Sequence, residues 1–196
     1  QLLARRVESD EARELTELIE SEVARLTELI DRLLSPQPAR AHEPLNIHVV
    51  LERVLRLAES DAGWAVKLVR DYDPSLPELP GDADRLTQVF INLISNARKY
   101  CDASRPELRI AVRQRAGRVT VDFIDNGKGI PKDAQSLIFE KFARLTDANR
   151  AGGAGLGLAI CREIMTNLGG SVAYLPGQGG AAFRVTVPLR LERMAA

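Results

Sequence analysis

The stretch Leu2–Leu34 contains neither glycine nor proline, and its apolar residues recur every three or four positions, which places them on one face of a helix. These residues are Leu15, Ile19, Val23, Leu26, Ile30 and Leu33. Charged residues cover the rest of the circumference, so other helices must cover the apolar stripe. Ser35-Pro36-Gln37-Pro38 ends the helix, because proline lacks an amide proton. We therefore predict a bundle helix at 1–35, a linker at 36–44 and one domain at 45–196. A helix that lies on its own domain is the alternative.

Length and charge limit the classes of function. At 196 residues the chain can hold one domain of about 100–150 residues and a smaller appendage. Lys plus Arg and Asp plus Glu both number 27, so the field that gathers nucleic acid is missing, and we expect no nucleic-acid partner. Two cysteines are too few for a disulfide framework, and no apolar run approaches the roughly 18 residues of a membrane helix. We expect a cytoplasmic chain. Because Gln1 falls inside a helical pattern, we expect a longer parent protein, whose membrane attachment the sequence leaves open.

The remainder of the chain predicts an α+β fold. Helices are predicted at Asn46–Ser60, from Asp82 or Asp84 to Tyr100, and at Leu156–Leu168, and strands at Val66–Tyr72, Leu108–Arg115, Val119–Asp125, Ser171–Leu175 and Ala182–Leu189. Helices and antiparallel strands in this order indicate a two-layer α/β sandwich, with a mixed sheet and helices on one face. The segment Asn126–Gly155 is polar and rich in glycine, and loops of that length inside a domain are usually functional.

One flank of the helix that ends at Tyr100 carries side chains suited to a metal triphosphate. Asn92, Asn96, Lys99 and Tyr100 follow one another at spacings of four, three and one, which puts them on one side. An amide oxygen is a hard ligand for Mg²⁺, and a lysine is a point cation for phosphate. Asparagines that only hydrogen-bond neighbouring backbone are equally consistent with this pattern alone.

Two glycine clusters follow. Asp125-Asn126-Gly127-Lys128-Gly129-Ile130 comes directly after a strand, where a carboxylate can accept a hydrogen bond from an exocyclic amine such as that of adenine. The same residues also make an ordinary turn. Gly152-Gly153-Ala154-Gly155-Leu156-Gly157-Leu158 runs into a helix, whose N-terminal amides and dipole attract an anion. No Gly-Lys-Ser/Thr follows, so it is not a Walker sequence, and a flexible hinge is the alternative.

The fourth cluster is Ile138-Phe139-Glu140-Lys141-Phe142-Ala143-Arg144. Two phenylalanines among polar residues would anchor a mobile lid, and Arg144 would reach a phosphate when the lid closes. Simple packing of the phenylalanines is the alternative, so this cluster depends on the other three.

Together the four clusters resemble the N box, the two glycine boxes and the F box of the superfamily that includes gyrase, the heat-shock chaperone, mismatch-repair proteins and histidine kinases. They occur in that superfamily's order, between about Asn46 and Leu189. The resemblance implies a Bergerat-type fold that binds ATP and Mg²⁺. It implies Asn96 as the Mg²⁺ ligand, Lys99 and Arg144 at the phosphates, Tyr100 beside the adenine and Asp125 on its amino group. The other implied residues of the ATP site are Asn92, Gly127, Gly129, Ile130, Phe139, Gly153, Gly155, Leu156, Gly157 and Leu158.

One position within this superfamily separates hydrolysis from transfer. The ATPase branches have a glutamate one helical turn before the metal-binding asparagine, where it activates water as a general base. Asn92 occupies that position, and an amide cannot accept a proton at neutral pH. We therefore expect a sensor histidine kinase that transfers the γ-phosphate. A serine kinase of the anti-sigma type and a non-catalytic module that dimerises and docks a response regulator are the alternatives.

The helix at 1–35 resembles the second helix of the dimerisation and histidine-phosphotransfer hairpin of these kinases. The resemblance implies a homodimer through this helix and the receiver domain of a response regulator as partner. The hairpin's first helix, with the phosphoacceptor histidine, is not in the sequence. His42-Glu43-Pro44 imitates its motif but lies in the expected linker, and for His48 we expect a surface or capping role. We therefore expect ATP binding without autophosphorylation of this chain.

Overall fold

The computed structural model describes residues 43–143 and 155–190, and every structural statement below refers to these ranges. The helix predicted at 1–35, residues 36–42 of the linker, Arg144 and Gly153 lie outside the described residues. The elements in chain order are β1 (Glu43–Leu45), α2 (Ile47–Glu59), β2 (Lys67–Tyr72), β3 (Leu79–Gly81), α3 (Ala83–Tyr100), β4 (Glu107–Arg115), β5 (Arg118–Asp125), α4 (Gly157–Asn167), β6 (Ser171–Tyr174) and β7 (Ala182–Pro188).

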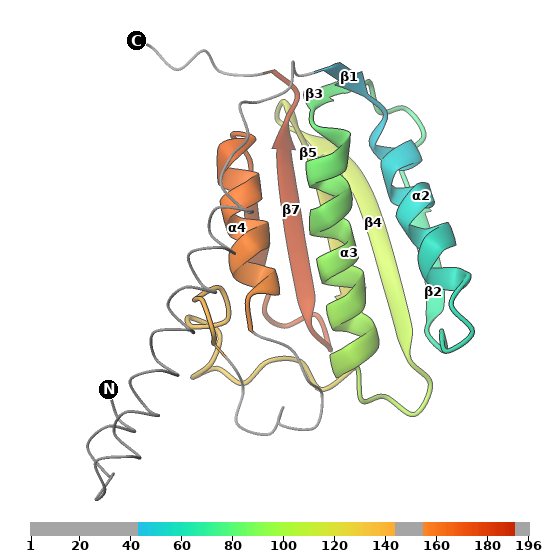
Figure 1. Cartoon of the computed structure of the whole chain (residues 1–196), viewed down its shortest axis with the longest axis vertical. Coiled ribbons are helices and arrows are strands. Elements are labelled where there is room, and N and C mark those ends of the chain that lie inside the picture. The colour runs from blue at the N-terminus through green and yellow to red at the C-terminus, as the bar shows by residue number, and fades with distance from the viewer. Residues whose placement is uncertain (1–42, 144–154, 191–196) are drawn as a thin grey trace, which may run out of the picture. The chain divides into compact units, whose positions relative to one another are not determined.

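Five of the strands form one mixed sheet in the order β2-β4-β5-β7-β6. Strand β2 runs parallel to β4, and the other neighbours are antiparallel. A parallel pair needs a crossover, and here the chain from β2 to β4 passes through α3. Figure 1 shows α2, α3 and α4 on one face of this sheet. The predicted α+β architecture, with a mixed sheet and helices on one face, is confirmed.

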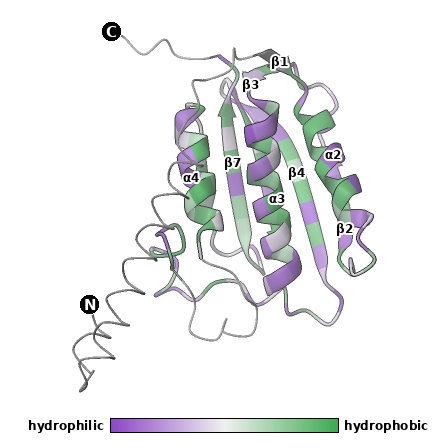
Figure 2. Ribbon diagram, viewed as in Figure 1, coloured by the Kyte–Doolittle hydropathy of each residue, from purple (hydrophilic) through white to green (hydrophobic). Residues whose placement is uncertain are grey.

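The core lies between the sheet and the three helices. Along β5 every second residue is buried, which is the pattern of a strand with one covered face, and β4 and β7 change between hydrophobic and hydrophilic residues along their length (Figure 2). Helix α3 faces the sheet with Leu86, Val89, Phe90, Leu93, Ile94 and Ala97. Phe90 packs on Phe123 of β5 with ring centroids 5.6 Å apart. The polar flank of α3 is therefore left free for other contacts.

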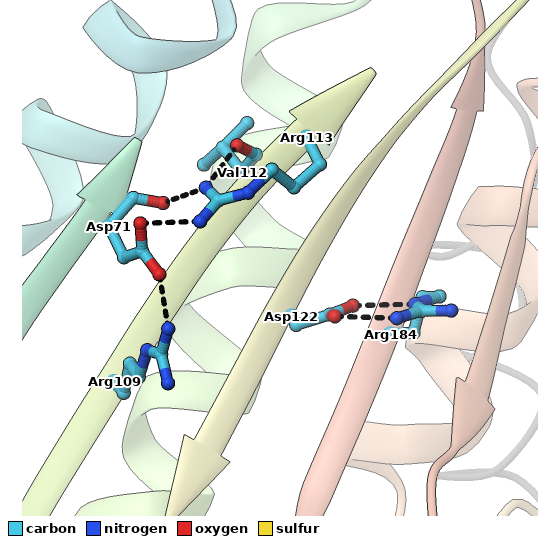
Figure 3. A network of polar contacts seen from close by, with 6 residues as sticks. All are labelled: Asp71, Arg109, Val112, Arg113, Asp122 and Arg184. Carbon is cyan, nitrogen blue, oxygen red and sulfur yellow. Dashed lines mark hydrogen bonds and ion pairs between the residues drawn. The ribbon is translucent and has the colours of Figure 1, made fainter. Parts of the chain in front are cut away.

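The other face of the sheet carries ion pairs between neighbouring strands (Figure 3). Asp71 of β2 pairs with Arg109 and Arg113 of β4, and Arg184 of β7 donates two hydrogen bonds of 2.7 Å to Asp122 of β5. These side chains are partly exposed, so water screens each ion pair and its contribution to stability is small. The strands therefore carry charged side chains on this face and apolar side chains on the face that the helices cover.

The sequence did not indicate β1 and β3, which pair with each other as a separate two-stranded sheet. Glu43 and Pro44, which we assigned to the linker, lie in β1. Each strand has three residues and contains a proline, a composition that argues against a strand when read alone. Their pairing depends on a distant contact, because buried Leu45 lies opposite buried Leu79.

Helix α3 begins with a side-chain cap that can be tested. The Asp82 carboxylate accepts hydrogen bonds of 3.0 Å from the backbone amides of Asp84 and Arg85. We expect Asp82→Ala to lower the free energy of unfolding by about 1 kcal/mol, because two amides of the first turn lose their acceptor. Asp82→Asn keeps an acceptor oxygen, so its loss in the free energy of unfolding should be only about a few tenths of a kcal/mol. Urea unfolding of both variants measures the difference, and equal losses would show that the cap bonds do not stabilise the helix.

Candidate functional site

Helix α3 carries the first predicted cluster on a flank that faces α4. The side-chain amide of Asn92 donates a hydrogen bond of 3.4 Å to the backbone carbonyl of Gly157, the first residue of α4. Gly157 is close to Asn92, since a Cβ on the glycine would lie 3.7 Å from the Asn92 Oδ1. The second glycine cluster and the asparagine cluster, 65 residues apart, are thus in contact.

The start of α4 has no side-chain cap among the described residues. Its N-cap position is occupied by Leu156, which makes no side-chain cap hydrogen bond, and the first turn contains no acidic residue. Leu158 packs partly against the core and fixes the turn to the domain. An uncapped helix start of this kind offers its amides and its dipole to an anion.

Asp125 ends β5 as a buried carboxylate and is only 9% exposed. Its Oδ1 accepts hydrogen bonds of 2.9 Å from the backbone amides of Gly127 and Ala181. The backbone amide of Asp125 in turn donates to the Ala181 carbonyl, also at 2.9 Å. One carboxylate oxygen therefore joins the end of β5, the first glycine cluster and the residue before β7, while no hydrogen bond to a described residue uses the other.

The electrostatic environment of Asp125 opposes its charge. Burial raises the pKa of the carboxyl above its ordinary value of 3.8, against the hydrogen bonds from Gly127 and Ala181, and the nearby charge of Asp102 raises it further. A carboxylate kept in such a place is unfavourable for folding alone, and perturbed groups of this kind gather at functional sites.

Gly180 comes closest to Asp125. A Cβ on this glycine would lie 2.1 Å from the Asp125 backbone oxygen and 2.7 Å from its Oδ1. Because the nearer obstacle is backbone, no side-chain movement can relieve it, and only glycine fits. The turn 176–180 is therefore part of the site.

The first glycine cluster continues away from Asp125 towards β6. Gly129 has a φ of +76°, and the backbone amide of Ile130 donates to the Tyr174 hydroxyl at 3.4 Å. Ile130 packs partly against the core. The Tyr174 ring also meets Phe183 edge-on, with centroids 5.7 Å apart. The loop is thus fixed at both of its ends.

The fourth cluster is anchored by one phenylalanine ring instead of the two that we expected. Phe139 packs edge-on against Phe183 at 6.3 Å, beneath the guanidinium of Arg162 at 6.0 Å. Phe142 is 51% exposed, and its backbone amide donates to the Gly155 carbonyl at 3.0 Å. A Cβ on Gly155 would lie 2.8 Å from a backbone oxygen, so this contact requires glycine there. The expectation that both rings anchor the segment was wrong for Phe142, which is held through its backbone.

Asn96, Lys99 and Tyr100 lie between these contacts. Asn96 is one turn after Asn92, about 6 Å along the helix axis, and is half-buried without a hydrogen bond to any described residue. Lys99 lies with its ammonium group 5.1 Å from the centroid of the Tyr100 ring, and Tyr100 is 48% exposed. The C-terminal half of α3 therefore has the start of α4 at one end and the first glycine cluster at the other.

Sequence reasoning missed several residues that build this region. They are Asp102, Asn126 in its side-chain role, Arg162, Tyr174, Gly180, Ala181 and Phe183. The turn Pro176-Gly177-Gln178-Gly179-Gly180 was visible as a turn, but nothing in it indicated that it approaches Asp125. A groove beside Arg162 runs along α4 and is lined by Lys141, Ala159, Arg162, Glu163, Thr166 and Asn167.

Two features are absent from the described ranges. No group of three or more His, Cys, Asp or Glu side chains is arranged there to hold a metal ion. Within the same ranges, the helices fall short of the length and hydropathy that a membrane span requires.

Comparison with known proteins gives a family match. Residues 81–191 match the model described as "Histidine kinase-, DNA gyrase B-, and HSP90-like ATPase". The sensory histidine kinase/phosphatase NtrB of Klebsiella oxytoca is 36% identical over 202 residues, covering 97% of this chain and 56% of the relative. NtrB of Rhodobacter capsulatus is 37% identical over 195 residues, covering 92% and 54%. The chain spans about half the length of these curated relatives.

Solved structures agree with the fold. The mycobacterial sensor histidine kinase MprB superposes with a TM-score of 0.67 at 25% identity, covering 76% of this chain and all of that one. The full-length kinase ShkA, in complex with AMPPNP, gives a TM-score of 0.67 at 26% identity, covering 97% of this chain and 42% of that one.

The buried charge of Asp125 predicts a pH-dependent gain in stability on its removal. Because the pKa of Asp125 is raised in the folded state, the folded chain binds that proton more tightly than the unfolded chain, so the ionised form lowers stability at neutral pH. Asp125→Asn keeps an oxygen for the two amides and removes the charge. We expect the variant to need more urea to unfold than wild type at neutral pH. The gap should close as the pH falls through the raised pKa of Asp125 towards 3.8.

The matched control is Asp133→Asn, which changes an exposed carboxylate in the loop that follows Asp125 and should leave the urea midpoint unchanged at neutral and at acid pH. If Asp125→Asn were less stable than wild type at neutral pH, the two amide hydrogen bonds would outweigh burial, and our account of this site would be wrong.

Proposed function

The chain belongs to the histidine kinase-, DNA gyrase B-, and HSP90-like ATPase family, as the four motifs predicted, and we propose that it is the ATP-binding catalytic module of a two-component sensor histidine kinase. In this proposal the γ-phosphate passes to a histidine outside this sequence and then to the receiver domain of a response regulator. The curated relatives that cover nearly all of this chain are named as sensory histidine kinase/phosphatases, which supports the kinase branch of the family.

The observation that carries the proposal is the Asp125 carboxylate, of which one oxygen accepts two hydrogen bonds and the other accepts none from a described residue. Its Oδ1 is held by two backbone amides, so the second oxygen is fixed in direction and left to accept a hydrogen bond. An adenine presents an exocyclic amine donor, whereas guanine presents a carbonyl oxygen at the equivalent place. A buried carboxylate therefore favours adenine over guanine. The full-length ShkA structure, similar to this chain, was solved with AMPPNP, an adenine nucleotide.

The residues on α3 and α4 fit the other end of the nucleotide. Asn96 offers an amide oxygen, and Mg²⁺ is usually bound through one or two protein oxygens together with substrate phosphates and water. When bound, Mg²⁺ would neutralise charge on those phosphates. Lys99, and Arg144 outside the described residues, would add cations. The backbone amides after Leu156 would donate hydrogen bonds to phosphate oxygens.

Transfer is favoured over hydrolysis because of Asn92. Its side-chain amide donates to the Gly157 carbonyl, so this position serves as a hydrogen-bond donor that holds the start of α4. A general base that activates water would have to be an acceptor for a proton, and an amide is not one at neutral pH.

The histidine at the start of α2 is poorly placed to accept a phosphate. The His48 ring stacks on Tyr72 with centroids 5.1 Å apart, and its Nε2 is buried without a hydrogen-bond partner among the described residues. Burial also lowers the pKa of His48, against the charges of Asp73 and Glu52. His42 lies outside the described residues. We therefore propose that the acceptor belongs to a dimerisation hairpin whose second helix is 1–35, in a homodimer.

Nucleotide binding is the first test. Wild type should bind ATP in a Mg²⁺-dependent manner by isothermal calorimetry and should prefer ATP to GTP. Asp125→Asn should weaken ATP at least about tenfold, because the retained oxygen already serves two amides and the new NH₂ group would face the amine of adenine. Asn96→Ala should weaken ATP mainly when Mg²⁺ is present.

Two matched controls accompany these variants. Asn167→Ala changes an exposed asparagine at the end of α4, and Asp133→Asn changes an exposed carboxylate, so both should bind ATP as wild type does. Absence of ATP binding by wild type at millimolar concentration would contradict the proposed function.

Phosphate transfer is the second test. The chain should be mixed with γ-labelled ATP and the dimerisation hairpin of a related NtrB that lacks its own catalytic domain. We expect label on the hairpin that is lost in acid, as phosphohistidine is, and none on this chain. Acid-stable label on a serine substrate would instead favour the anti-sigma type of kinase. Fast release of free phosphate without a hairpin would contradict the role given to Asn92.

A further inference from the structure

We propose that Asp102 and Asn126 are positioning residues that together clasp two loops and so set the affinity and base selectivity of the nucleotide site. The first loop is the connection 101–106 between α3 and β4, taken together with Glu107, the first residue of β4. The second is the glycine loop 126–130 that follows β5. The inference rests on the proposed ATP-binding function and adds residues that lie outside the four motif roles.

Asn126 reaches from the glycine loop to the connection. Its Oδ1 accepts hydrogen bonds from the Glu107 backbone amide at 2.8 Å and from the Cys101 thiol at 3.2 Å. Its Nδ2 donates to the Arg105 carbonyl at 2.9 Å. All of these partners lie on the same connection, so a single side chain ties its beginning, its middle and its end to the residue after Asp125.

Asp102 reaches in the opposite direction, from the connection to the glycine loop. Its Oδ1 accepts a hydrogen bond of 3.0 Å from the backbone amide of Lys128, and its Oδ2 lies 3.4 Å from the Lys128 ammonium. The two loops are close here, because a Cβ on Gly127 would lie 3.2 Å from both the Asp102 Oδ1 and the Cys101 Cα. The two reciprocal links form the clasp.

The backbone hydrogen bond is the stronger part of the Asp102 link. The Lys128 and Asp102 side chains are 71% and 47% exposed, so water screens their ion pair and its contribution is small. The bond from the Lys128 amide is the main reason why the pKa of Asp102 lies below its ordinary value. A hydrogen bond to a charged acceptor resists solvent better than an exposed ion pair does. Removal of the acceptor should therefore matter more than removal of the charge.

The clasp acts on the site through its position in the chain. The connection begins directly after Tyr100 and the glycine loop directly after Asp125, so the clasp fixes the end of α3 relative to the base-binding carboxylate. A nucleotide that reaches from Asp125 to Asn96 needs that separation. If the loops are already held at the right distance, binding does not have to order them, and affinity rises.

The test compares variants of the full chain. Asp102→Ala and Asn126→Ala should each weaken ATP about five- to tenfold by calorimetry and lower the ratio of GTP to ATP dissociation constants, because a loosened loop aims Asp125 less well. Asp102→Asn keeps an oxygen for the Lys128 amide and should restore affinity to within about twofold of wild type. Hydrogen exchange of the nucleotide-free chain should quicken at the Lys128 amide in Asp102→Ala and at the Glu107 amide in Asn126→Ala.

The matched control is Asp73→Ala, which removes an equivalent hydrogen bond of 3.0 Å from the backbone amide of Ser75 in a loop elsewhere in the domain. It should not alter ATP affinity. Unchanged ATP affinity or an unchanged ratio in Asp102→Ala and Asn126→Ala would overturn the inference, as would an equal loss in Asp73→Ala. Failure of the proposed function would differ, since wild type itself would then not bind ATP, while the exchange rates would still show whether the clasp exists.

Discussion

The arrangement of the site depends on one buried carboxylate. Asp125 occupies a position in β5 where Val119, Val121 and Phe123 are the preceding buried residues, so the strand pattern itself demands an apolar side chain there. The chain instead has a carboxylate, which is kept in place by the amides of Gly127 and Ala181. Two hydrogen bonds reduce the penalty of burial without removing it, because the pKa remains raised. A folded chain that keeps such a group gains something other than stability from it.

Helix α3 connects that carboxylate to the rest of the site, because each side of the helix contacts a different element. The side towards the sheet is apolar and buried, with Phe90 on Phe123. A second side meets α4 through Asn92, and a third meets the turn after α2 through Arg98, which pairs with Asp61 at 2.5 Å. Contacts on three sides restrict rotation of the helix about its axis. The direction of Asn96, which has no described hydrogen bond of its own, therefore follows from packing elsewhere on the same helix.

The sequence predicted what local periodicity and order in the chain can encode. It predicted the long strands and a helix that begins at Asp82 or Asp84, and four ordered clusters indicated the family. It could not predict contacts that depend on tertiary approach. Gly180 looked like any turn glycine, because its need for a missing side chain arises only from the backbone of Asp125. Likewise, Phe142 and Phe139 look equivalent in sequence, yet Phe139 packs against Phe183 whereas Phe142 is 51% exposed.

Asn92 also depends on a tertiary contact. Its sequence position shows an asparagine where the ATPase branches have a glutamate, and the structure gives a physical reason for that difference. A carboxylate at this position would bring its negative oxygens towards the Gly157 carbonyl, an acceptor, and the two would repel. The amide of asparagine presents a donor to that carbonyl, and the bond of 3.4 Å links α3 to the first turn of α4. Asn92 also contacts the buried thiol of Cys161, whose pKa burial raises to about 12 against the hydrogen bond with Asn92. An asparagine at position 92 therefore fits the contact between α3 and α4 better than a carboxylate would, which agrees with the proposal of transfer in place of hydrolysis.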